Sequence, residues 1–179
     1  MTDLMDRWPM NPAFVYDDTQ EILATNALGR ALHSPFKLAD NFARMVFLDP
    51  AGTRFFVEWE RVAIDTVGSL RQAWGKGTSR HRVETVVAEL RASADFEKMW
   101  ETHAITGKSY QRKSIDHPAV GRLTLDYLTF AIPDAHDHHL LVCDAPAGSP
   151  SERLLELLGS LTVPPAPHEV ADESATERP

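Results

Sequence analysis

One long amphipathic helix near the middle of the chain limits the folds that this sequence can adopt. Its apolar residues recur at spacings of 3, 4, 4, 3 and 4 and form a continuous face: Phe56, Trp59, Ala63, Val67, Leu70 and Trp74. This is the period of an α-helix that buries one side. Gly75–Gly77 ends it. Such a face must pack against other elements of the same domain.

Two strands precede this helix. The sequence predicts strands over Ala13–Tyr16 and Glu21–Thr25, joined by an Asp-rich turn at Asp17–Gln20. Asn26 can cap a short helix over Ala27–His33, because its side chain can accept a hydrogen bond from an otherwise unpaired backbone N–H.

Further helices surround the long one. Asp40–Leu48 predicts a short helix, and Asp49–Pro50 marks the start of the long helix, with Asp as cap and Pro at the first helical position. Two more helices are predicted over Arg80–Ala92 and Asp95–His103.

Strands return in the last third of the chain. Ser109–Ile115 predicts a polar edge strand, Arg122–Ile132 a long strand and His139–Asp144 a return strand after a hairpin turn at Pro133–His138. The alternation of Arg122–Ile132 changes phase: Leu123, Leu125 and Tyr127 give way to Leu128, Phe130 and Ile132. This change predicts a β-bulge or a strong bend inside the strand.

The last ordered element is a helix that begins at a capping box, Ser149–Glu152, with Pro150 at the first helical position. Four leucines are expected on its buried side: Leu154, Leu157, Leu158 and Leu161. Residues 162–179 are rich in Pro and acidic residues, which predicts a disordered tail after a domain spanning residues 1–161. Two strands, a block of helices, three strands and a helix predict an α+β fold, one antiparallel sheet covered by helices.

Composition excludes several classes of protein. The chain of 179 residues fits one domain, and its net charge of −8 opposes direct binding to a phosphate backbone. Its one cysteine, Cys143, rules out a disulfide framework and is interpreted as a small buried apolar residue. With no membrane-spanning run and no signal-peptide core, a cytoplasmic setting without membrane contact is expected.

Histidines are the first candidates for chemistry. The His136–His139 segment is interpreted as a solvated hairpin tip, since its spacing suits no metal site, and no metal or cofactor is expected. His103 and His117 lack a nucleophile motif such as Gly-x-Ser-x-Gly. We therefore expect no catalytic residue, and both histidines have either a packing role or a role in ligand contact.

Other candidates lie on the helices. Asn41 and Arg44 share one face of a short helix, and the Arg44 guanidinium could pair with a ligand carboxylate. The alternative is that Arg44 pairs with an acidic side chain of this protein. Trp59 and Trp100 suit either a packed core or the wall of an apolar pocket. The predicted ligand-binding set is therefore Asn41, Arg44, Trp59, Trp100, His103 and His117.

An ordered set of short motifs spans the chain to about Leu161: Trp8–Asn26, Asn41 with Arg44, Phe47–Pro50, Glu58–Trp59, Phe96–His103, Lys113–Leu125 and Gly148–Pro150. In these motifs the chain resembles the MmyB-like transcription regulator ligand-binding domain. The resemblance implies a PAS-like fold, with a five-stranded antiparallel sheet covered by helices. It also implies a small-molecule sensor in a bacterial regulator, with fatty acids as the suggested ligand class.

The resemblance further implies a helix-turn-helix domain upstream, which this chain does not show before Trp8. The chain is thus expected either to be an effector domain separated from its DNA reader or to lack one. DNA contact would come only through that reader, and a homodimer is a further expectation. Two alternatives stay open: a small hydrolase using His103 or His117, and a dimerisation module without ligand.

Overall fold

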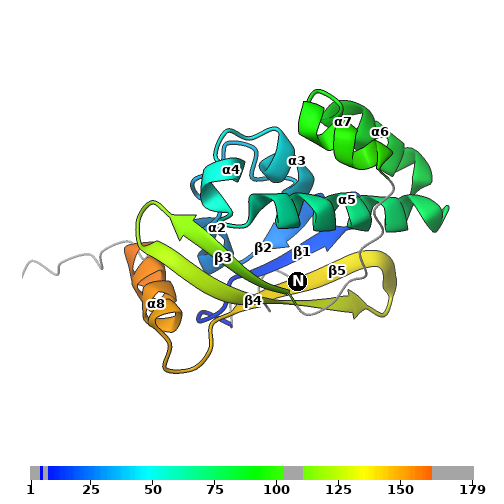
Figure 1. The fold of residues 1–179 in the computed structure, drawn as a ribbon. Helices are drawn as coiled ribbons and strands as arrows, with labels where there is room; N and C mark the ends of the chain where they lie inside the picture. Colours follow the sequence, from blue (N-terminus) through cyan, green and yellow to red (C-terminus); the bar gives the residue numbers. More distant parts are fainter. Residues whose placement is uncertain (1–4, 6–7, 103–110, 163–179) are drawn as a thin grey trace, which may run out of the picture.

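Five strands form one antiparallel sheet in the order β2-β1-β5-β4-β3 in the computed structural model, which describes Met5, residues 8–102 and residues 111–162 (Figure 1). The strands are β1 (Ala13–Asp17), β2 (Ile22–Thr25), β3 (Gln111–His117), β4 (Gly121–Ile132) and β5 (Ala135–Asp144). Strand β1 pairs with β5, so the N-terminal hairpin and the C-terminal strands share one sheet. The predicted five-stranded sheet and the α+β class are confirmed.

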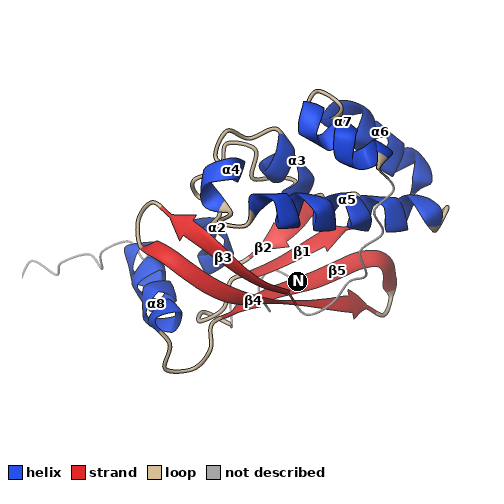
Figure 2. Cartoon of the chain, viewed as in Figure 1, coloured by secondary structure: helices blue, strands red, loops and turns tan. Residues whose placement is uncertain are grey.

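The described residues between β2 and β3 form a series of helices with short connections, and one more helix follows β5 (Figure 2). They are α2 (Ala27–Leu32), α3 (Phe42–Phe47), α4 (Gly52–Phe55), α5 (Trp59–Gly75), α6 (Arg80–Leu90), α7 (Ala94–Glu101) and α8 (Pro150–Thr162). Helix α5 lies across the sheet, and α6 and α7 lie on the side of α5 that faces away from it (Figure 1).

The long helix predicted to begin near Asp49 is interrupted, because α4 and α5 are separate helices. Phe56 lies between them in extended conformation and forms an isolated bridge with Ile115 of β3. The next residue, Val57, donates its N–H to the carbonyl of Ser114 at 3.0 Å. Strand β3 is the sheet edge, and this linker pairs with one of its free carbonyl groups, which a residue bonded within a helix could not do.

Helix α5 buries two sides rather than one. Ala63, Val67 and Leu70 of the predicted face are buried, and Val67 and Leu70 pack in one cluster with the buried valines of α6. Trp74 instead is 39% exposed and donates its indole N–H to Glu84 at 3.2 Å. The predicted apolar face is therefore divided: Val67 and Leu70 form a helix–helix contact, whereas Trp59 and Ala63 belong to the core cluster that includes residues of the sheet.

The β-bulge expected inside β4 is absent at the change of phase. Pairing with β5 stays in register from Asp126 to Ala131, and an irregularity occurs only between Ala131 and Ile132. Leu125 is buried in the cluster under the helices, whereas Ile132 packs against a second cluster that includes residues of β1. The alternation of apolar residues changes phase because one face of the strand is buried near its start and the opposite face is buried near its end.

The turn between β4 and β5 is shorter than predicted. Strand β5 begins at Ala135, so only Pro133 and Asp134 form the turn. The interpretation of His136–His139 as a solvated hairpin tip is wrong for His139, which is 8% exposed. Strand alternation turns His139 to the same side as buried Leu141.

Helix α8 begins as predicted, and its buried face agrees with the prediction only in part. Ser149 accepts the N–H of Glu152 at 3.2 Å, as expected for the cap. Leu158 is buried and Leu154 packs against the core, as predicted. Leu157 and Leu161 are 47% and 61% exposed, which contradicts the prediction for these two, and Leu155 is buried instead.

A side-chain contact near the start of α8 explains this orientation. The Ser151 hydroxyl accepts the backbone N–H of Thr124 in β4 at 2.9 Å and so fixes the rotation of the helix. The predicted disordered tail lies outside the described residues, except for Thr162 at the end of α8.

Asn26 is a buried junction that joins the first strand to the first helix. Its side-chain oxygen accepts from Ala13 N at 3.1 Å and Gly29 N at 2.8 Å, which confirms the predicted cap. Its amide group donates to Asn11 O at 2.8 Å and Trp8 O at 3.2 Å.

We expect Asn26→Ala to lower the free energy of unfolding by about 2–4 kcal/mol, because it leaves buried N–H and C=O groups unpaired. Urea unfolding measures this loss. Asn26→Ser is the matched control: its hydroxyl keeps a cap acceptor for the start of α2, so its loss should be smaller. A loss for the alanine variant below about 0.5 kcal/mol would contradict the assigned role.

Candidate functional site

A cavity of about 550 Å³ lies between the helix-covered face of the sheet and helices α3 and α5. This volume is within the range of small-molecule sites. Its apolar wall comes from both layers: Tyr16, Phe42, Met45, Val46, Phe56, Val62 and Leu141. The cavity is therefore bounded by elements from both ends of the chain.

The side of α5 that faces the sheet is polar. Asp65, Ser69, Gln72 and Lys76 line the cavity at spacings of 4, 3 and 4, one stripe along the helix. A polar stripe over the interior of a sheet cannot pack as core does, so a space stays between the layers. This stripe was missed in the sequence, although its helical spacing and the expected sheet on that side could have revealed it.

The cavity has a closed end and an open end. Met45, Val46 and Val62 are 1%, 4% and 5% exposed and form the closed apolar end. Gln72 of α5 and Lys76, the residue that follows this helix, are exposed, as is the opposite segment 129–131 of β4. The opening therefore lies between the C-terminal end of α5 and the second half of β4.

The polar part of the cavity contains a lysine on the inner face of β3. The Lys113 Nζ lies 4.6 Å from the ring centroid of Tyr127, a cation–π distance. Burial lowers the pKa of Lys113, and the nearby Asp65 partly opposes this. The hydroxyl of Tyr127 is buried without a hydrogen-bond partner among the described residues, and burial raises its pKa well above the ordinary value.

A second polar group lies around Asp18. Its carboxylate contacts His139 Nε2 at 2.9 Å, Lys76 Nζ at 3.2 Å and Ser79 Oγ at 3.2 Å. Burial raises the pKa of Asp18, but the hydrogen bonds from His139 and Lys76 outweigh it and hold the pKa below its ordinary value. The cation of Lys76 is thus already paired within the protein.

His33 lines the cavity from α2's C-terminal end and is 5% exposed. Its ring stacks on Phe14 with centroids 4.4 Å apart, and its Nδ1 has no hydrogen-bond partner within the described part of the chain. Burial, with a contribution from His117, lowers the pKa of His33 to about 3, so the ring is neutral at physiological pH.

His117 is buried near His33, and both of its ring nitrogens contact backbone groups. Its Nε2 lies 3.2 Å from the carbonyl of Ala31, and its Nδ1 accepts the N–H of Ala119 at 3.2 Å. The ring is therefore neutral with its proton on Nε2, and burial lowers its pKa. Both nitrogens are used in the fold, and the ring does not line the cavity.

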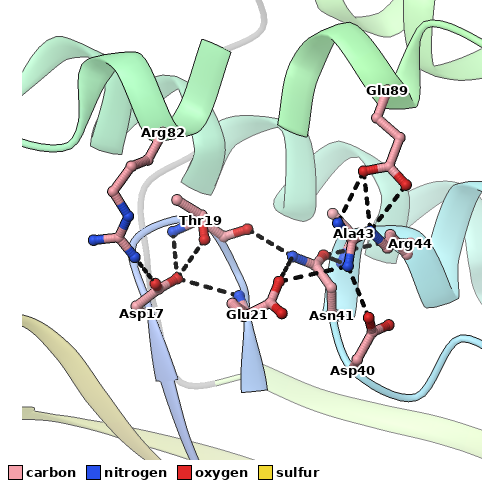
Figure 3. A network of polar contacts seen from close by, with 9 residues as sticks. All are labelled: Asp17, Thr19, Glu21, Asp40, Asn41, Ala43, Arg44, Arg82 and Glu89. Atoms are coloured by element: carbon pink, nitrogen blue, oxygen red, sulfur yellow. Dashed lines mark hydrogen bonds and ion pairs between the residues drawn. The ribbon is translucent and has the colours of Figure 1, made fainter. Parts of the chain in front are cut away.

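Asn41 caps α3 (Figure 3). Its side-chain oxygen accepts from Ala43 N at 2.9 Å and Arg44 N at 3.2 Å, and its amide donates to Thr19 O at 2.9 Å. The residue is completely buried at 0% exposed. Asn41 thus joins α3 to the turn between β1 and β2.

Arg44 joins the same region to α6. Its guanidinium contacts both carboxylate oxygens of Glu89, with Nε–Oε1 3.0 Å and Nη2–Oε2 2.9 Å, and pairs with Asp40 at 2.8 Å (Figure 3). Hydrogen bonds to Glu89 raise its pKa. The alternative that Arg44 pairs with an acidic side chain of this protein is confirmed for Asp40.

Arg82 forms a second tie between α6 and the β1–β2 turn. It pairs with Asp17 and, at 2.9 Å, with Asp137 (Figure 3 shows the Asp17 pair). Asp17 also accepts the N–H of Thr19 at 2.8 Å. Helix α6 is therefore held at two points along its length.

The remaining predicted site residues lie apart. Trp59 donates its indole N–H to Val46 O at 2.9 Å and sits behind the cavity wall. Trp100 stacks on Phe96 in the α6–α7 cluster. His103 lies outside the described residues. The structure does not bring the six predicted residues together around the cavity, and their roles in ligand binding stay predictions.

Among the described residues, no three His, Cys, Asp or Glu side chains converge as a metal ion would need. None of the helices in this part of the chain is long and apolar enough to span a bilayer.

The model of one protein family, described as MmyB-like transcription regulator ligand binding domain, matches residues 1–158 of the chain. None of the curated proteins matches it.

A double-mutant cycle tests the pair between Arg44 and Glu89. We expect Arg44→Met and Glu89→Gln to show a coupling of about 0.5–1 kcal/mol in the free energy of unfolding, since the pair is bidentate but partly exposed. Chemical denaturation of the four proteins gives this value. Zero coupling would indicate that Arg44 is available for another partner.

His33 predicts a dependence of stability on pH. Its pKa is about 3 in the folded protein and ordinarily 6.5, so below pH 6.5 the unfolded chain binds a proton that the folded chain does not. Stability therefore falls as pH falls through this window, by about 2 kcal/mol between pH 8 and pH 5 from this residue.

We expect His33→Phe to remove that part of the loss, whereas His81→Phe, at an exposed site on α6, should not. Urea unfolding at several pH values measures both. Parallel stability curves for wild type and His33→Phe would refute the assignment.

Proposed function

Because the chain belongs to the MmyB-like transcription regulator ligand binding domain family, we propose that it senses a fatty-acid-like molecule and serves as the effector domain of a bacterial regulator. The ligand would lie in the cavity between the sheet and α5. The observation that carries the proposal is the division of this cavity into a buried apolar end and a polar, open end.

The closed end suits an apolar chain. Phe42, Met45, Val46, Phe56 and Val62 converge there, and four of these side chains are less than 9% exposed. Transfer of an apolar chain from water into such a space gains about 25 cal/mol for each Å² that is buried. An amphipathic ligand can place its tail here and keep its polar head near the middle or mouth of the cavity.

Unpaired polar atoms in the wall support an occupied cavity. The Nδ1 of His33 and the hydroxyl of Tyr127 are buried without a partner among the described residues. A buried polar atom without a hydrogen bond destabilises the fold, by about 1–3 kcal/mol. A ligand, or water that accompanies it, can satisfy these atoms.

The same side chains favour binding over catalysis. Burial raises the pKa of Cys143 to about 12, so this thiol is protonated and a poor nucleophile. His117 uses both ring nitrogens in backbone contacts. We therefore propose a non-catalytic domain, rather than a hydrolase that uses His103 or His117.

A ligand can act as a signal only if it binds two states of the protein with different affinity. In the proposal, DNA contact comes through a helix-turn-helix domain upstream of this chain, since a net charge of −8 opposes phosphate binding by the domain itself. The regulator would act in the cytoplasm, and a dimer contact could carry the change between states.

The direct test is organic extraction of the purified chain followed by mass spectrometry, together with thermal shifts on adding octanoic, dodecanoic or hexadecanoic acid. We expect a co-purifying lipid or a rise in melting temperature with at least one acid, because a ligand that binds only the folded state stabilises it. The proposal would be refuted if no lipid co-purified and none of the three acids raised the melting temperature.

A cavity-filling variant tests the location. Ser69 lines the cavity and is half-buried, so Ser69→Phe should block the space and reduce the acid-induced shift by more than half. Thr85→Phe adds similar bulk at an exposed site on α6 and should leave the shift unchanged. An undiminished shift in folded Ser69→Phe would place the ligand elsewhere.

A further inference from the structure

Lys113 occupies an unusual position for a lysine. On β3 the side chains alternate, and Lys113 lies on the same side as Ile115 and His117, which are 0% and 2% exposed. This side faces the helices and the cavity, and Lys113 is part of the cavity wall. Its neighbours on the other side include Arg112, which pairs with Asp126 at 2.7 Å.

The ammonium of Lys113 contacts an aromatic ring but has no ion pair with a carboxylate among the described residues. Its contact within the described part of the chain is with the Tyr127 ring at 4.6 Å. Asp65 of α5 is close enough to favour the charged form, yet no ion pair forms between them within 4.0 Å. A half-buried cation without a paired anion is costly, and the pKa of Lys113, lowered by desolvation, is consistent with that cost.

Two other cations near the cavity already have partners. Lys76 pairs with Asp18 at 3.2 Å, and Arg44 pairs with Asp40 and Glu89. Of the two lysines that line the described cavity, Lys113 is thus the one available to a ligand.

The hydroxyl of Tyr127 is the second unfilled group. Lys113 is paired across the ladder with Leu125, and Tyr127 lies two residues further along β4, so the two side chains are diagonal neighbours on one face. The hydroxyl is buried and has no hydrogen-bond partner within the described ranges. A cation and a hydroxyl donor therefore lie together on one wall. The neighbouring polar group is the Cys143 thiol, which is opposite Tyr127 on β5 and is a weaker hydrogen-bond acceptor than a carboxylate.

We propose that Lys113 and Tyr127 form the head-group site of the cavity and bind the carboxylate of a monocarboxylic acid with an apolar tail. The ammonium pairs with one carboxylate oxygen, and the Tyr127 hydroxyl donates a hydrogen bond to the head group. The tail lies toward the closed end at Met45 and Val62. This inference rests on the proposed function and specifies which part of the ligand is recognised.

The test compares three probes with one tail: dodecanoic acid, dodecan-1-ol and methyl dodecanoate. Their affinities for the purified chain are measured by calorimetry below the micelle concentration. Wild type should bind the acid at least about tenfold more tightly than the alcohol or the ester, since a charge-assisted pair is lost in both. Equal affinity for all three would refute a carboxylate site but leave the proposed function intact.

Variants locate the effect. Lys113→Met should weaken binding of the acid by about tenfold or more and change binding of the alcohol by less than about threefold. Tyr127→Phe should weaken acid binding by a smaller factor, and Lys113→Arg should retain most of it. Lys37→Met, which removes a lysine at an exposed site, is the matched control and should bind as wild type does.

The outcomes separate the two levels of the proposal. If wild type binds none of the probes, the proposed fatty-acid-like ligand fails. If wild type prefers the acid but Lys113→Met, folded by circular dichroism, binds it equally well, the head-group site fails and the cavity stays a ligand site. If Lys113→Met does not fold, Lys113→Arg and Tyr127→Phe are compared with wild type instead. The shared site would be overturned if Tyr127→Phe bound the acid as tightly as wild type and Lys113→Arg lost its affinity for the acid.

Discussion

The pairing of β1 with β5 is the contact on which the rest of the structure depends. It joins Ala13–Asp17 to a strand that ends at Asp144, so the hairpin at one end of the chain and the meander at the other become one sheet. The helices between them must then lie on that sheet as one long connection. The same pairing places Tyr16 opposite His139, and both line the cavity.

The two sides of α5 explain why a cavity exists above this sheet. Its apolar side packs on α6 and α7, and its polar stripe from Asp65 to Lys76 faces the sheet. Polar side chains need hydrogen-bond partners or solvent, so the layers cannot close as they do where both surfaces are apolar. The ion pairs of Arg44 and Arg82 hold α6, and through it α5, in this position.

Local signals predicted most of the elements correctly. The Asn26 cap, the capping box at Ser149 and the strand pairs around the Asp-rich turn depend on neighbours in the sequence, and the structure confirms them. Failures occurred where a distant contact decides. Phe56 leaves the helix because the edge of β3 needs a partner, and Leu157 is exposed because Ser151 fixes the rotation of α8 against β4.

The sequence by itself determined the class of fold and the family, because periodicity, caps and ordered motifs are properties of neighbouring residues. The tertiary structure alone decided which polar groups are already paired. Arg44 looked available for a ligand, yet Glu89, 45 residues later, binds it. Lys113 looked like a surface residue of a polar strand, yet it faces the cavity without an ion pair. Pairing and burial depend on side chains brought together from distant segments, which no local pattern encodes.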